Sequence, residues 1–82
     1  MNSRTQFPKP IWLSKGLHGP IVEVDTAERA AELLETWPNG RGKWYIAASR
    51  ACRAASSGKA SPIMAREMFV QAALEAQLPM AQ

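Results

Sequence analysis

The chain has 82 residues, of which 46% are hydrophobic and 21% are charged, and it carries a formal net charge of +3 with one cysteine and one histidine. This length allows one domain, and the composition is that of a folded globular protein rather than a disordered one. The cysteine and histidine cannot supply an internal disulfide or the four ligands of a structural zinc site, and no apolar run approaches the roughly 20 residues of a membrane span. We expect a cytoplasmic protein without a cofactor and without a membrane segment.

The two ends of the chain predict flexible segments around one domain. Residues 1–8 contain a single strong hydrophobe, Phe7, and run into a Pro-Lys-Pro sequence that favours extended backbone and blocks a helix. Pro79 follows the last apolar pattern, and the residues after it are expected to fray. We therefore assign residues 1–8 to a flexible lead-in, residues 9–78 to a single domain and residues 79–82 to a frayed tail.

A hairpin is predicted at the start of the domain. Residues 11–13 and 21–24 are short β-prone runs, and the segment between them contains two glycines. In the second run Val22 and Val24 share one face. Two strands alone are marginal in water, so either a helix must cover one face of the hairpin or a second copy of the chain must extend it.

The first predicted helix begins at a capping-box pattern. Asp25 is the expected N-cap residue, and Glu28 stands three positions later, where its side chain can reach back to the cap. Apolar residues then recur at helical spacing as far as Trp37. The helix should end there, because a proline follows and disfavours helical backbone at the residue before it.

Two further helices complete the predicted fold. One runs over residues 43–57, with Gly58 as its C-terminal cap, and its inner face is rich in alanine. The other begins with Ser61 as N-cap and proline at the first helical position, and it runs to about residue 76. The fold class is therefore α+β: an N-terminal β-hairpin followed by three α-helices in the order β-β-α-α-α, with the helices packed together and against the hairpin.

Several residues of these helices form a recognisable pattern. They are Trp37-Pro38 at the end of the first helix, the spacing Ala48…Cys52…Gly58 in and after the second, and Ala65-Arg66, Phe69 and Ala72-Ala73 in the third. On these residues the chain resembles the small bacterial family catalogued as domain of unknown function 982, over nearly its whole length. The resemblance implies the fold, and it implies no activity, cofactor or catalytic residue.

The candidate catalytic groups point away from an enzyme. The only histidine, His18, lies in the predicted hairpin loop, whereas Cys52 lies on the alanine-rich inner face of the second helix, where a small buried hydrophobe is expected. A nucleophile needs a base within hydrogen-bonding reach, and these residues do not supply that pair. The glutamates of the first helix lie on its outer side and indicate a solvated face.

Basic residues offer a possible contact with anions or nucleic acid. Lys43, Arg50 and Arg53 fall within about a third of a turn of each other on the second helix. Arg41 belongs to the loop before that helix, whose N-terminus favours an anion, but the loop lacks the pattern of a phosphate-binding loop. The third helix, which would be the recognition helix of a helix-turn-helix protein, carries only Arg66 as a basic residue. Nucleic acid is therefore disfavoured.

The third helix predicts a contact between copies of the chain. Beside its main apolar face, Ile63, Val70 and Leu74 project on a separate side, about 180° from Ala72. A second strip of large aliphatic residues on so small a domain is typical of a contact with a partner or with the hairpin, and we favour the contact with a partner. We favour a non-catalytic interaction or regulatory module that forms a homodimer. The alternative is a nucleic-acid-binding protein that uses the basic residues, and a small enzyme comes third.

Overall fold

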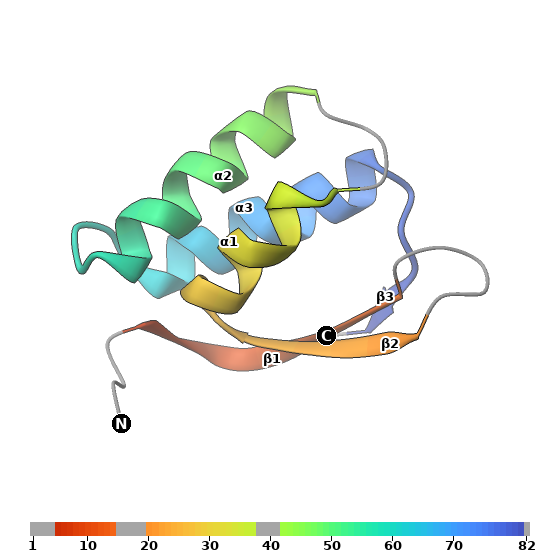
Figure 1. The fold of residues 1–82 in the computed structure, drawn as a ribbon, viewed down its shortest axis with the longest axis horizontal. Helices are drawn as coiled ribbons and strands as arrows, with labels where there is room; N and C mark the ends of the chain where they lie inside the picture. The colour runs from red at the N-terminus through yellow and green to blue at the C-terminus, as the bar shows by residue number, and fades with distance from the viewer. Residues whose placement is uncertain (1–4, 15–19, 38–41, 82) are drawn as a thin grey trace.

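A computed structural model describes residues 5–14, 20–37 and 42–81. Its elements are, in chain order, β1 (Gln6–Ser14), β2 (Ile21–Thr26), α1 (Ala27–Glu35), α2 (Lys43–Ser56), α3 (Pro62–Glu75) and β3 (Met80–Ala81). The three helices lie together on one side of the sheet (Figure 1). The predicted α+β fold, a hairpin followed by three helices, is confirmed, and the structure adds a short third strand.

The third strand makes β1 the centre of the sheet. The strand order is β2-β1-β3, and both pairings are antiparallel. Met80 pairs with Leu13, and the backbone N–H of Ser14 donates to the carbonyl oxygen of Pro79 at 2.9 Å. A frayed tail was expected over residues 79–82, and the structure differs from this at residues 79–81, whereas residue 82 lies outside the described residues. The physical reason is Leu78, which is buried and so brings the chain back to the sheet after α3.

The N-terminal end also differs from the expectation. A flexible lead-in was expected over residues 1–8, of which residues 1–4 lie outside the described residues. Within residues 5–8, β1 begins at Gln6, and both Thr5 and Phe7 are buried. The hydroxyl of Thr5 donates to the carboxylate of Glu28 at 2.8 Å, which ties this end of the chain to α1. The pairing register shifts between Gln6 and Ile11, where the two prolines of β1 lie.

The helix ends follow the sequence signals closely, with one correction. Ser61 accepts a hydrogen bond from the amide of Ile63 at the start of α3, as predicted, and Gly58 has a φ of 77°, the left-handed conformation expected after α2. The N-cap of α1 is Thr26 rather than the expected Asp25, and its hydroxyl accepts from the amide of Arg29. Glu28 is therefore one position too early to close a capping box.

The core lies between the helices and the inner face of the sheet. Ile11, Leu13 and Val24 supply the sheet side, and Phe69 of α3 is the largest of the fully buried side chains. The ring of Phe69 meets that of Trp37 edge to face, with centroids 5.4 Å apart and planes at 69°. Fully buried alanines allow α2 and α3 to approach closely; they are Ala48, Ala55, Ala65, Ala72 and Ala73.

Candidate interaction surface

The face of the sheet opposite the helices carries exposed apolar side chains. Neighbouring residues of a strand point to opposite faces, so Leu13 turns into the core while Trp12 turns outward. Trp12 is 45% exposed and Ile21 is 70% exposed. Together they line a shallow groove of about 200 Å³ whose other walls are Ser14, Pro79, Met80 and Ala81. We call the outward-facing residues of this groove, Trp12, Ser14, Ile21 and Ala81, the open sheet face.

The predicted strip on α3 is interrupted. Ile63 and Leu74 are exposed, at 57% and 56%, but Val70 between them is buried, with only 8% of its surface accessible. Ile63 and Leu74 stand 11 residues apart, which is roughly 16 Å along a helix. The expectation of three exposed aliphatic residues on one strip is therefore wrong at Val70. The cause is the position of α3, which contacts α1, α2 and β1 and so has more than one covered side.

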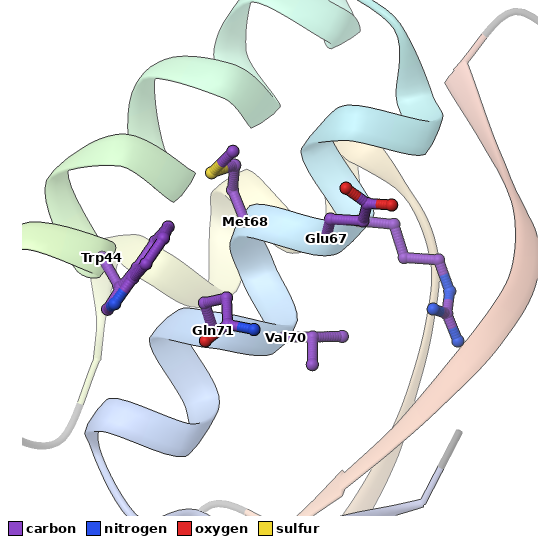
Figure 2. Close-up of a pocket in the computed structure, with 6 residues that line it drawn as sticks. Trp44, Glu67, Met68, Val70 and Gln71 are labelled. Atoms are coloured by element: carbon purple, nitrogen blue, oxygen red, sulfur yellow. The ribbon is translucent and has the colours of Figure 1, made fainter.

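Val70 borders a second cavity, of about 280 Å³, between α2 and α3. Figure 2 shows Trp44 of α2 projecting beside Met68 and Gln71 of α3. The volume of this cavity is slightly below the roughly 300–1,000 Å³ of typical ligand pockets. Of its charged lining residues, Arg66 is already engaged, because its Nε donates to the carbonyl oxygen of Lys9 at 2.8 Å. This bond joins α3 to β1.

The N-terminus of α2 holds an anion that belongs to the chain itself. The carboxylate of Glu75, at the end of α3, accepts hydrogen bonds from the backbone amides of Trp44 at 3.4 Å and Tyr45 at 3.3 Å. The first amides of an α-helix lack a carbonyl of a preceding turn as partner, and the positive end of the helix dipole favours a negative group beside them. The position that the sequence indicated for an external anion is therefore filled by Glu75.

The basic residues of α2 are exposed to solvent. Lys43, Arg50 and Arg53 lie on one side of the helix by its rotation, and Ile46, which is also exposed, lies among them. The helix itself contains no aspartate or glutamate. The Nζ of Lys43 lies 5.5 Å from the ring centroid of Trp44. Arg41, the fourth predicted contact, lies outside the described residues.

The candidate nucleophile Cys52 lies in the core. Cys52 is fully buried, and desolvation by burial raises the pKa of its thiol to about 12, so the group is neutral at physiological pH. Its sulfur lies 3.8 Å from the carbonyl oxygen of Ala65. His18 lies outside the described residues. Glu32, on the exposed side of α1, forms a 3.6 Å ion pair with Arg29.

Neither a metal-binding cluster nor a membrane-spanning helix is present in the described ranges 5–14, 20–37 and 42–81. Within them no group of three or more histidine, cysteine, aspartate or glutamate side chains is arranged to hold a metal ion. None of the helices in the same ranges combines the length and the apolar character needed to cross a membrane.

The comparison with known families agrees with the fold. A family model described as "Protein of unknown function (DUF982)" matches residues 9–80. The chain belongs to this family. The resemblance inferred from Trp37-Pro38 and the alanine pattern is thereby confirmed, and the match reaches from β1 to β3. No curated protein and no solved structure matched the chain.

In this member of the DUF982 family, two features of the surface had no clear signal in the sequence. Trp12 and Ile21 belong to the runs that predicted the hairpin, but only the placement of all three helices on one side leaves them open. Glu75 bonds to amides 30 and 31 positions earlier in the chain, and no local pattern links such distant residues. The one available signal for it was the glycine before α2, Gly42, which leaves room for the carboxylate.

Proposed function

We propose that the chain is a non-catalytic protein-interaction module that acts as a homodimer in the cytoplasm. The observation that carries the proposal is the open sheet face, where Trp12 and Ile21 stay exposed on a domain of only 82 residues. Large aromatic residues are enriched in interface cores and rarely stay exposed beside another apolar residue without a partner. The neutral, buried thiol of Cys52 supports a role without nucleophilic chemistry.

The open sheet face is a better contact surface than the strip on α3. Trp12 and Ile21 line one groove, whereas Ile63 and Leu74 are separated by the buried Val70. Burying a large aliphatic or aromatic side chain contributes roughly 1.5–3 kcal/mol, but the gain offsets the entropy of association only when such residues are contiguous. The surface predicted from α3 is therefore not the one we propose.

The experiment compares two substitutions of exposed residues. Trp12→Gln removes the aromatic ring of the open sheet face, and Ile46→Gln removes an exposed residue of similar accessibility from α2 as the matched control. Self-association is measured by sedimentation equilibrium, with helix content checked by circular dichroism. We expect Trp12→Gln to weaken association and Ile46→Gln to leave it unchanged. Association that is equal in both variants would exclude the open sheet face as the contact, and a parent that stays monomeric at hundreds of micromolar would contradict the proposed homodimer.

Nucleic-acid binding is the second candidate, and one observation favours it. The exposed side of α2 presents Lys43, Arg50 and Arg53 on a helix without any acidic residue. Three positive charges on one helix face can contact a phosphate backbone. The net charge of +3 is nevertheless small, and α3 presents no comparable set of basic residues.

A salt titration separates this candidate from the first. The parent and a variant with Arg50→Gln and Arg53→Gln are compared for binding to a fluorescent duplex by anisotropy. A phosphate-binding role requires that affinity fall steeply with salt and that the variant lose about two phosphate contacts from the salt slope. We expect no binding at near-physiological salt. A salt-dependent signal that the double substitution weakens would promote this candidate over the homodimer.

A further inference from the structure

The outer edge of β2 is the exposed sheet edge best suited to pairing. In the described part of the chain, β2 hydrogen-bonds to β1 alone. The other side of β1 is protected, because β3 covers Trp12 and Leu13, and Pro8 and Pro10 have no amide hydrogen to offer an incoming strand. The strand Ile21–Thr26 contains no proline. Its free backbone groups are therefore available to another strand.

The hydrogen bonds of β1 show which residues of β2 face outward. The amide of Ser14 donates to Pro79 on the β3 side, so the backbone of Ser14 points away from β2. Ser14 is paired with Ile21, and in an antiparallel pair both residues point either toward each other or away from each other. The N–H and C=O groups of Ile21 therefore point to the free edge. Because these groups alternate along a strand, those of Glu23 do so as well.

We propose that β2 pairs with β2 of a second copy of this chain, antiparallel about a twofold axis that passes beside Val22. This inference rests on the proposed homodimer and places its contact at the β2 edge of the open sheet face, where Ile21 lies. In this register Val22 lies opposite Val22 of the partner subunit, and Ile21 lies opposite the partner's Glu23. Each such pair exchanges two backbone hydrogen bonds, so the twofold axis produces four.

Charge selects this register among the symmetric ones. An axis beside Glu23 would place two glutamates directly opposite each other, and an axis beside Val24 would place Glu23 opposite the partner's Asp25. Like charges directly opposite each other destabilise a sheet. If the register between the two β2 strands were shifted by a single residue, side chains that face the core would lie opposite side chains that face outward. An axis beside Ile21 would leave fewer residues of β2 paired. Pairing about Val22 avoids all of these.

The same register explains why Ile21 is so exposed in the single chain. On the outer face of the sheet its side chain would lie over the aliphatic part of the partner's Glu23, which is itself paired with Trp12 within its own subunit. The exposed isoleucine of one subunit would thus extend the open sheet face of the other. The combined sheet would have six strands, with β2 no longer at an edge.

Opposite charges at position 21 provide a matched test. Ile21 is 70% exposed, so Ile21→Lys and Ile21→Glu remove the same side chain with little effect on the folded monomer. In the proposed register a lysine at position 21 faces the partner's Glu23, whereas a glutamate faces a like charge. We expect Ile21→Glu to raise the dimer Kd about tenfold or more relative to Ile21→Lys. The double variant Ile21→Glu with Glu23→Lys should restore the dimer, because the opposite charges again face each other.

Disulfide trapping reports the register directly. Val22 would form a non-hydrogen-bonded pair with the partner's Val22. In such a pair the two Cα atoms lie about 4.5 Å apart, which is close enough for a disulfide between cysteines at these positions. Val22→Cys should be trapped as a covalent dimer under oxidising conditions, whereas Glu23→Cys should not. Cys52 does not interfere, because it is buried.

The outcomes separate this inference from the function on which it rests. A parent that sediments as a dimer, with Val22→Cys trapped and Ile21→Glu dissociated, supports both. A dimeric parent that is trapped through Glu23→Cys, or that tolerates both changes at position 21 equally, overturns the β2 contact and leaves the homodimer standing. A parent that stays monomeric at hundreds of micromolar overturns both.

Discussion

The carboxylate of Glu75 lies so close to Gly42 that a Cβ atom at position 42 would stand 2.6 Å from its Oε2 atom. Any residue other than glycine would therefore push the carboxylate away from the amides of Trp44 and Tyr45 that it bonds. This contact holds the end of α3 against the start of α2. Gly42 thus leaves room for this close approach, and a side chain at position 42 is accommodated only when the flexible end of Glu75 shifts. The backbone angle is ordinary, since the φ of Gly42 is −91°.

A double-mutant cycle tests this contact. Gly42→Ala should lower the free energy of unfolding by about 1–3 kcal/mol, because the displaced carboxylate leaves charge-assisted hydrogen bonds unmade. Glu75→Ala should cost a similar amount. In the Glu75→Ala background the added methyl group of Gly42→Ala meets no carboxylate, so its further effect should be small. Urea unfolding of the four proteins measures the coupling, and fully additive costs would show that the two residues act independently.

Trp37 should be essential for stability. It is buried two residues beyond the end of α1 at Glu35 and packs edge to face on Phe69. Trp37→Ala should cost about 3–5 kcal/mol, a large share of the 5–15 kcal/mol that stabilises a typical domain, and should leave much of the chain unfolded. Thermal melts followed by circular dichroism provide the measurement, with Trp12→Ala as the control because Trp12 is 45% exposed. Similar melting temperatures for Trp37→Ala and the parent would show that Trp37 does not pack against Phe69 in the core.

Charged substitutions on α3 should distinguish its covered side from its open one. Val70→Lys places a charge at a buried position and should destabilise the fold by several kcal/mol. Leu74→Lys places the same charge at an exposed position of the same helix and should change stability by less than about 0.5 kcal/mol. Denaturant midpoints of the two variants give the comparison. If Val70→Lys were as stable as Leu74→Lys, position 70 would be open to solvent.

The thiol of Cys52 should respond to pH only in alkaline solution. Burial raises its pKa from the ordinary 9.0 to about 12, so between these pH values the folded chain keeps a proton that the unfolded chain releases. The free energy of unfolding should therefore fall as pH rises from about 9 to 12, and this thiol should contribute no slope below that window. Denaturation of the parent and Cys52→Ala at several pH values isolates the contribution. At neutral pH a thiol reagent should label the native protein slowly, and rapid labelling would mean an exposed thiolate.

The predicted and observed folds agree where local chemistry decides the structure. The N-cap at Ser61 and the left-handed residue at Gly58 depend on hydrogen bonds and backbone angles within a few residues, and both are where the sequence placed them. Apolar spacing located the three helices for the same reason. Thr26 replaced Asp25 as a cap because adjacent residues can serve equally well, and a shift of one position is within the usual uncertainty of helix ends.

The disagreements concern contacts between distant segments. The rotation of α3 correctly separated Val70 from Ala72, but rotation says where a side chain points and does not say how many neighbouring elements cover the helix. Residues 5–8 and 79–81 contain too few apolar side chains to form a pattern of their own, and each segment is ordered by what it meets elsewhere in the fold. The hydrogen bond that the amide of Tyr45 in α2 donates to the carboxylate of Glu75 could not be predicted from the sequence for the same reason.

The central position of β1 has a consequence for how the chain folds. This strand is the first element, yet one of its two partners is β3, so the pairing of Trp12 with Ala81 closes a loop that contains every helix. Such a loop is expensive in chain entropy, and contacts of this kind form slowly compared with helical turns. The pairing of β3 should therefore come after the transition state for folding. An interaction that forms so late affects the rate of unfolding and has little influence on the rate of folding. The few residues after α3 should therefore slow the unfolding of the native protein.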